Sequence, residues 1–364
     1  MSGSKSSRRR FLVSAAAGVA AAPAYSLRGS ATEVGPEGNR KGSIARIVTT
    51  CQNGARHSTV EANRDHMLVL FDHALKQKPD LVCFPETFTG VGVESKPEKV
   101  AETVPGPTTD AFARRAKANR CYVICPIRTV REGKHWNSAV VLDRSGQIAG
   151  IYDKIHPVTT SPDYTDFENG IMPASAPPVL DLDFGRIGIQ ICFDAGFPET
   201  WAALASKGVK AVFWPSAYHG GFALQTYAYL HHFYVITAVH TEHSRIIDPC
   251  GRVVAETDSL MNFVTRDINL DYVVAHYDFN YPIPDRLLDA YPGRVRITSY
   301  VEDGHFIVEP TDPTVTTAQL QSEFGFESAF QYFDRHRKGY EALRAGKVPE
   351  PQTAAHGKRD QYAK

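Results

Sequence analysis

The sequence predicts an α/β protein whose sheets contain both parallel and antiparallel strands. Short apolar segments alternate with longer segments in which apolar residues recur with a 3.6-residue period, as expected for strands followed by helices. Several pairs of apolar segments flank a glycine turn, which is typical of antiparallel hairpins. The chain has 364 residues, of which 43% are hydrophobic and 22% charged, so it can bury a large core.

The elements are assigned in chain order. The first strand is expected over residues 44–51, and the first helix over 58–77, where Met67, Phe71 and Leu75 share one face. A strand over 80–84, a helix over 108–119, a strand over 121–126 and hairpin strands over 136–143 and 147–152 follow. Next come hairpin strands over 179–183 and 186–192, a helix over 198–207, a strand over 211–215, a helix over 225–232, a strand over 235–240, hairpin strands over 244–249 and 252–256, and a late helix over 330–343.

Charge and cysteine content exclude several functions. The 40 Lys and Arg residues balance 40 Asp and Glu residues, so the chain lacks the basic excess of nucleic-acid-binding proteins. The six cysteines are scattered and form no Cys-x-x-Cys pair, which argues against a zinc ribbon, a redox dithiol or a disulfide scaffold. Three of them, Cys83, Cys121 and Cys125, stand in apolar segments and are expected to be small buried hydrophobic residues.

The N-terminus has the pattern of an export signal. Arg8, Arg9 and Arg10 precede an apolar, Ala-rich run that ends at Ala22-Pro23-Ala24. The paired arginines resemble the twin-arginine type, so residues 1–24 predict export to the periplasm or the medium. The apolar run is too short to span a bilayer, and we expect no stable membrane insertion. Residues 25–43 and 349–364 are expected to be a disordered lead and a disordered tail.

Three side chains capable of chemistry stand directly after predicted strands. Glu86 follows Phe84-Pro85, Lys154 follows the hairpin strand over 147–152, and Cys192 ends the strand over 186–192. Open α/β sheets present their active residues at such strand ends. A thiol in this position can expose its sulfur and use neighbouring backbone N–H groups as an oxyanion hole. The three residues are far apart in sequence, so their convergence is inferred from topology.

These motifs, in this order, resemble the carbon–nitrogen hydrolases of the nitrilase superfamily. The matching segments, which span residues 44–270, are Phe84-Pro-Glu86, Asn137-Ser-Ala139, Tyr152-Asp-Lys-Ile-His156, Ile191-Cys-Phe-Asp194 with Phe197-Pro-Glu199, and Ser244-Arg-Ile-Ile-Asp-Pro-Cys-Gly251. The resemblance implies a four-layer α-β-β-α sandwich and a homodimer or higher homo-oligomer. Residues 271–348 would then be a C-terminal extension, either a solvated helix or an arm that packs across the dimer.

The resemblance also implies a role for each site residue. Cys192 would be the nucleophile and Glu86 the general base, while Lys154 and the backbone N–H of Phe193 would stabilise the oxyanion. Glu168 stands where many relatives carry a second glutamate, and Trp214, Tyr218 and His219 are pocket candidates. His156, Asp194 and Glu199 would support the nucleophile turn. No metal and no organic cofactor is required.

The predicted reaction is hydrolysis of a small linear amide through a Cys thioester. Cys192-Phe-Asp194 is more similar to amidases than to nitrilases, which usually carry Cys-Trp-Glu. A nitrilase, an N-carbamoyl hydrolase and an inactive binding module with the same fold are the alternatives. The sequence departs from the family at Trp214 and at Thr237-Ala-Val-His240, where relatives often have asparagine. These departures concern family-typical pocket and interface contacts and leave the Glu–Lys–Cys triad intact.

Overall fold

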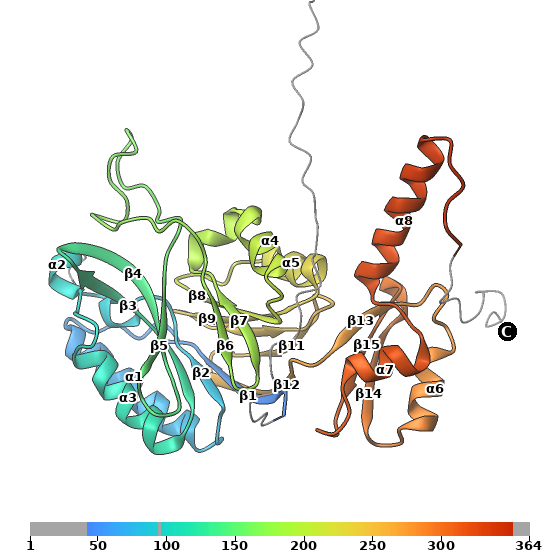
Figure 1. The fold of residues 1–364 in the computed structure, drawn as a ribbon. Helices are drawn as coiled ribbons and strands as arrows, with labels where there is room; N and C mark the ends of the chain where they lie inside the picture. Colours follow the sequence, from blue (N-terminus) through green and yellow to red (C-terminus); the bar gives the residue numbers. More distant parts are fainter. Residues whose placement is uncertain (1–41, 94–95, 352–364) are drawn as a thin grey trace, which may run out of the picture. The chain divides into compact units, whose positions relative to one another are not determined.

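The computed structural model describes residues 42–93 and 96–351. The predicted export signal, residues 25–41 of the predicted lead and residues 352–364 of the predicted tail lie outside the described residues. The described chain contains two six-stranded sheets and a smaller three-stranded sheet (Figure 1). The strands and helices follow the order expected from the sequence up to residue 256.

The first sheet has the order β12-β1-β2-β3-β4-β5. Its strands are β1 (Ile44–Thr50), β2 (Leu81–Cys83), β3 (Tyr122–Arg131), β4 (Lys134–Leu142), β5 (Ile148–Asp153) and β12 (Phe263–Asn269). The central strands β1, β2 and β3 are parallel. Strands β12 and β4 pair antiparallel with β1 and β3, and β5 pairs antiparallel with β4. Helices α1 (Val60–Leu75) and α3 (Pro107–Asn119) connect the parallel strands, with the short elements η1 (Phe88–Gly90) and α2 (Pro97–Val100) between them.

The second sheet has the order β11-β10-β9-β8-β7-β6. Its central strands β7, β8 and β9 are parallel, and the pairs outside them are antiparallel. Its strands are β6 (Val179–Leu182), β7 (Gly185–Ile189), β8 (Ala211–Ser216), β9 (Tyr234–Val239), β10 (Arg245–Ile247) and β11 (Val253–Glu256). Its connections are η2 (Cys192–Gly196), α4 (Pro198–Ser206) and α5 (Ala223–His231). Pro107 and Pro198 each open a helix at the first position, where a missing N–H costs no hydrogen bond.

Alternating side chains divide each strand between two cores. On β3, Ile124 points into a core shared by both sheets, whereas Val123 packs under α1 and α3. On β8, Phe213 joins the shared core, whereas Trp214 packs under α4 and α5. Each sheet is therefore buried on both faces, one against the other sheet and one against helices. The layers follow in the order helix, sheet, sheet, helix (Figure 1). The predicted four-layer α-β-β-α sandwich is confirmed.

Residues beyond 270 form a further sheet with its own core. Strands β13 (Val273–His276), β15 (His305–Pro310) and β14 (Val295–Tyr300) pair antiparallel in that order. Helices α6 (Ile283–Ala290), α7 (Thr317–Phe324) and α8 (Ala329–Arg344) and the short η3 (Val301–Asp303) complete this part. Only the last of these helices was predicted from the sequence, and the possible arm across a dimer stays a prediction.

Two other elements differ from expectation. Strand β3 continues to Arg131 and forms a hairpin with β4 through Glu132 and Gly133, both at positive φ. Its second half mixes apolar residues with Arg128, Thr129 and Arg131, so the apolar run ends before the strand does. Strand β12 carries charged residues at an exposed sheet edge and pairs with β1 from 213 positions or more along the chain. Edge strands of this kind carry little apolar signal.

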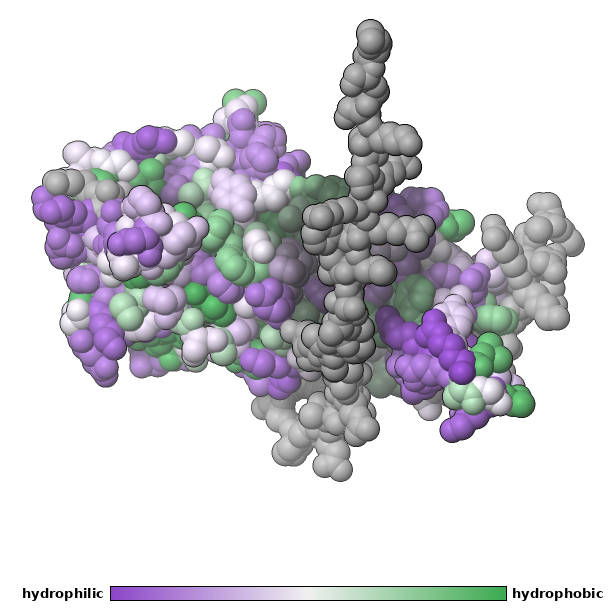
Figure 2. Space-filling view, turned by 90° about the horizontal axis from the view of Figure 1, so that it is seen from above, coloured by the Kyte–Doolittle hydropathy of each residue, from purple (hydrophilic) through white to green (hydrophobic). Residues whose placement is uncertain are grey.

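All six cysteines are buried free thiols. None of the helices within 42–93 and 96–351 is both long and apolar enough to cross a membrane. On the face drawn in Figure 2, hydrophobic residues are interspersed among hydrophilic ones.

Candidate active site

Glu86 lies in the loop that follows β2 and is 5% exposed. Its Oε1 accepts hydrogen bonds from Lys154 Nζ at 2.9 Å and Asn137 Nδ2 at 2.8 Å, and its Oε2 accepts one from the Ala217 N–H at 2.9 Å. Burial alone would raise the pKa of Glu86, but the nearby ammonium of Lys154 and these hydrogen bonds hold it below the usual value. The buried carboxyl is therefore ionised and can accept a proton.

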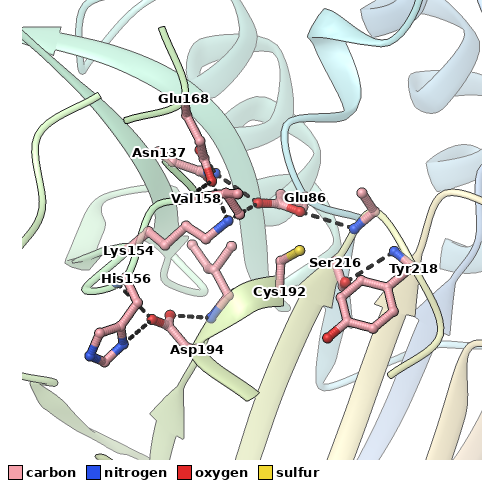
Figure 3. Close-up of polar contacts among 12 residues, drawn as sticks. Glu86, Asn137, Lys154, His156, Val158, Glu168, Cys192, Asp194, Ser216 and Tyr218 are labelled. Atoms are coloured by element: carbon pink, nitrogen blue, oxygen red, sulfur yellow. Dashed lines mark hydrogen bonds and ion pairs between the residues drawn. The ribbon is translucent and has the colours of Figure 1, made fainter. Parts of the chain in front are cut away.

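Lys154 follows β5 and is 1% exposed. Its backbone N–H donates to the Asn137 carbonyl at 2.9 Å, and its Nζ donates to Glu86 Oε1 at 2.9 Å and Glu168 Oε1 at 2.6 Å. Burial would lower the pKa of Lys154, yet the charges of Glu86 and Glu168 raise it well above its usual value. The ammonium is a permanent cation at the centre of the site (Figure 3).

Glu168 lies in the loop between β5 and β6 and reaches the same lysine. Its Oε1 also accepts the Val158 N–H at 3.2 Å, and its Oε2 accepts Asn137 Nδ2 at 3.1 Å. Its carbonyl accepts Arg128 Nη1 at 3.1 Å. The φ of Glu168 is +45°, a left-handed conformation that is uncommon outside glycine. The loop is therefore fixed by contacts on both the side chain and the backbone of Glu168.

Cys192 begins η2 at the end of the segment that follows β7, with φ of +47° and 9% exposure. Its carbonyl accepts the Trp214 Nε1–H at 3.1 Å. Its sulfur points into the space between Lys154, Glu86 and Ser216 (Figure 3). Burial and the Glu86 charge raise the pKa of the Cys192 thiol to about 12, although Lys154 and Ser216 oppose them. The resting nucleophile is therefore a neutral thiol that needs a base.

Asp194 fixes the turn that carries Cys192. Its Oδ2 accepts the Ile191 N–H at 2.8 Å and the Tyr152 hydroxyl at 2.6 Å. Its Oδ1 accepts the backbone N–H of His156 at 2.9 Å and the ring Nδ1–H at 2.8 Å. Tyr152 and His156 flank Lys154, so one fully buried carboxylate connects the lysine segment with the nucleophile turn. These contacts are those that a residue supporting the nucleophile turn would make, and the role of Asp194 and His156 stays a prediction.

Phe193 lies in the first turn of η2. The N–H groups of a first turn have no acceptor one turn earlier in the same helix. The Phe193 N–H is next to the nucleophile, so it has the position expected for an oxyanion donor. The role itself stays a prediction.

The three pocket candidates lie in different environments. Trp214 is fully buried under α4 and α5 and supports the nucleophile backbone from the core, because its indole N–H is bonded to Cys192. Tyr218 is 45% exposed and packs edge-on against Trp214, with ring centroids 5.4 Å apart. Burial raises its pKa, and so does the nearby charge of Glu86. His219 is exposed, and its Nδ1 accepts the Gly221 N–H at 3.3 Å.

Four contributors to the site were not among the predicted site residues. They are Asn137, Ser216, the backbone N–H of Ala217, and His240, whose Nε2 donates to the Glu86 carbonyl. Asn137 belongs to a segment that the sequence analysis quotes, and His240 is the polar residue directly after β9. A polar residue at a strand end is the signal that could have identified His240, whereas Asn137 lies within β4. Within 42–93 and 96–351, no group of three or more His, Cys, Asp or Glu side chains could hold a metal ion.

Comparison with known proteins identifies the family of this chain. The family model "Carbon-nitrogen hydrolase" matches residues 47–276, which is more than half of the chain. A deaminated glutathione amidase of Synechocystis sp. is 29% identical over 228 residues, covering 56% of this chain and 84% of that protein. Omega-amidase NIT2 of Xenopus tropicalis is 26% identical over 233 residues, covering 58% and 84%.

Solved structures show the same fold. The crystal structure of Saccharomyces cerevisiae Nit3, a nitrilase superfamily member, superposes with a TM-score of 0.53 at 18% identity, covering 68% of this chain and 94% of that one. An amidase from Nesterenkonia sp. gives a TM-score of 0.53 at 21% identity, covering 62% and 90%. The matched residues contain Glu86, Lys154, Glu168 and Cys192. The chain belongs to the carbon–nitrogen hydrolase family.

Proposed function

We propose that this hydrolase cleaves a small linear amide through a thioester on Cys192. The observation that carries the proposal is a neutral thiol beside an ionised, buried glutamate and a lysine cation held by two carboxylates. This arrangement supplies a nucleophile, its base and an electrostatic partner for an oxyanion. The relatives named as amidases support an amide as the substrate.

Acylation starts from the neutral thiol. Glu86 takes the proton from Cys192 Sγ as the sulfur attacks the amide carbon, and the carbonyl oxygen becomes an oxyanion. The Lys154 ammonium and the Phe193 N–H stabilise this negative charge. The protonated Glu86 then gives its proton to the leaving nitrogen, the carbon–nitrogen bond breaks, and ammonia or an amine departs from the thioester.

Deacylation reuses the same base. Glu86, again a carboxylate, takes a proton from water as the water oxygen attacks the thioester carbon. The second oxyanion faces the same donors, and its collapse breaks the carbon–sulfur bond. The proton held by Glu86 returns to sulfur, so the free thiol and a carboxylic acid product are formed. Glu168 takes no proton in this cycle and keeps Lys154 in place through the 2.6 Å contact.

A substrate screen tests the proposal. Wild-type protein and Cys192→Ala are incubated with linear amides, nitriles and N-carbamoyl compounds, and ammonia release is measured. We expect release from amides with wild type alone. Turnover confined to nitriles or carbamoyl compounds would contradict the amide assignment, and equal release with Cys192→Ala would contradict the nucleophile.

We also propose that the protein is exported and forms a homodimer. The twin-arginine pattern at Arg8 and Arg9 supports export. Lysine in place of both arginines should leave an uncleaved precursor in the cytoplasm, whereas N-terminal sequencing of secreted wild type should start near Tyr25.

The dimer is supported by two exposed apolar side chains, Phe222 at the start of α5 and Leu230 within it. Light scattering after size exclusion should give twice the chain mass, and a monomer at micromolar concentration would contradict the dimer.

A further inference from the structure

We propose that Asn137 is a positioning residue that commits one oxygen of Glu86, Oε2, to proton transfer. The inference rests on the proposed function, since it assigns how the general base is held. Asn137 lies on β4 beside Lys154, is 2% exposed and is in contact with both glutamates of the site. It is not one of the residues that accepts or donates a proton in the cycle above.

The side-chain amide of Asn137 closes a ring of hydrogen bonds. Its Nδ2 donates one hydrogen to Glu86 Oε1 at 2.8 Å and the other to Glu168 Oε2 at 3.1 Å. Lys154 Nζ joins the same two carboxylates through Glu86 Oε1 and Glu168 Oε1. The backbone carbonyl of Asn137 also accepts the Lys154 N–H. One residue therefore positions the base, the cation and the second glutamate (Figure 3).

Counting lone pairs shows which oxygen of Glu86 can react. A carboxylate oxygen accepts about two hydrogen bonds. Oε1 already accepts two, from Lys154 and Asn137, whereas Oε2 accepts one, from the Ala217 N–H. The remaining lone pair is on Oε2. Without Asn137, Oε1 would also have a vacant lone pair, and the carboxylate would lose the contact that fixes its rotation.

The orientation of the amide follows from electrostatics. The opposite flip would place Oδ1 against two carboxylates, which is repulsive, so the NH2 group faces them. In this orientation Oδ1 is buried and has no hydrogen-bond partner among the described residues. An unpaired buried oxygen costs stability, and an apolar side chain of the same shape would avoid that cost. The amide at position 137 is therefore better explained by its two donors than by packing.

Asn280 offers a matched control. It is also fully buried, its Nδ2 donates to the His276 carbonyl at 2.9 Å, and its Oδ1 likewise has no partner among the described residues. It lies between β13 and α6, in the part with the three-stranded sheet. Asn137→Leu and Asn280→Leu thus remove the same kind of group from a buried position, and only the first contacts the base.

The experiment compares wild type, Asn137→Leu and Asn280→Leu on an amide that wild type hydrolyses. We expect Asn137→Leu to lower kcat by about ten- to a hundredfold, as for one lost hydrogen bond to a charged group, with little change in KM. The lost donor had favoured the carboxylate form, so the pKa of Glu86 rises and the acid limb of the pH–rate profile moves to higher pH. Asn280→Leu should keep the kcat and the acid limb of wild type.

A second readout needs no substrate. The infrared carboxyl band of Glu86, assigned by its loss in Glu86→Gln, should titrate at higher pH in Asn137→Leu than in wild type. Should Asn137→Leu fail to fold, Asn137→Asp keeps the shape and adds a third carboxylate, so the band should shift in the same direction. A folded variant with an unshifted band and an unshifted acid limb overturns the inference. A shifted band in a protein that hydrolyses no amide would overturn the proposed function alone.

Discussion

The two large sheets contribute different things to the site. The first supplies charge, because Glu86, Asn137 and Lys154 follow or belong to its strands and bond to one another. The second supplies the nucleophile, because Cys192 follows β7 on a left-handed backbone. Asp194 connects the two sides through Tyr152 and His156. The reaction geometry therefore depends on how the two sheets pack together as much as on the triad.

The largest effect is expected on the nucleophile side. Cys192→Ala removes the atom that forms the thioester, so kcat should fall on the order of 10⁶-fold while the protein stays folded. Ammonia release and the melting temperature are the two measurements. Cys250→Ala, which removes another buried free thiol, should retain wild-type kcat. Comparable losses in the two variants would mean that Cys192 has no special role.

The next effect concerns the charged side. Lys154→Met keeps the length of the side chain but removes the cation, and the loss of one oxyanion donor costs about 10²- to 10³-fold in kcat. The variant also leaves Glu86 and Glu168 without their shared counter-ion, so the pKa of Glu86 should rise. Steady-state kinetics across pH would detect both changes. If folded Lys154→Met had the kcat of wild type, the electrostatic role of Lys154 would be contradicted.

The pH dependence distinguishes a base mechanism from a preformed thiolate. Glu86 has a lowered pKa, so it is already ionised at neutral pH, and activity should fall only as pH drops through that low value. The pKa of Cys192 is about 12, so the thiol should produce no rise in activity near its ordinary value of about 8.5. We expect kcat/KM to be flat between about pH 6 and 9. A rise centred near pH 8 would show a titrating thiolate instead.

The lowered pKa of Glu86 also makes the free energy of unfolding depend on pH. Its folded pKa is below its unfolded pKa, so its contribution is present above the unfolded value and is lost as pH falls through the folded value. Urea unfolding of wild type and Glu86→Gln should therefore converge as the solution is acidified, apart from differences in packing. Divergence on acidification would contradict the sign of the shift.

The smallest effect tests the packing between the sheets. Ile124 and Val123 are neighbours on β3, both fully buried, but only Ile124 lies between the sheets. Ile124→Ala should cost about 2–5 kcal/mol of unfolding free energy, as cavities of this size do. We expect a few-fold lower kcat in this variant and unchanged kcat in Val123→Ala. Equal kcat values in Ile124→Ala and Val123→Ala would show that the reaction geometry does not depend on the packing between the sheets.

Much of the main fold was predictable because apolar periodicity is strong in buried parallel strands. Strands β2, β8 and β9 are almost continuously apolar, β1 is apolar at four of its seven positions, and all four were placed within a few residues. The edge strand β12 and the small sheet beyond residue 270 were not predicted. Strands β12 and β14 are partly exposed and mix polar and apolar residues, and β12 pairs with β1, which is distant in sequence. The short buried strands β13 and β15 were missed as well.

The site followed the same division. Glu86, Lys154 and Cys192 stand next to strand ends, and Glu168 was placed by family resemblance alone. Asn137 and His240 could not be ranked from sequence, since their importance lies in the atoms they contact. Asn137 donates hydrogen bonds to two glutamates, and His240 donates one to the backbone carbonyl of Glu86. Trp214 looked like a pocket residue by position, but its side chain points into the core.

Direct observation of the acyl-enzyme tests the central claim. Wild type is mixed with a slowly hydrolysed amide, quenched in acid and analysed by intact-protein and peptide mass spectrometry. The account predicts one adduct with the mass of the acyl group, on the peptide that contains Cys192, and its absence in Cys192→Ala. An adduct on any of the other five cysteines would contradict it. So would steady hydrolysis of the amide with no acyl adduct on the quenched enzyme.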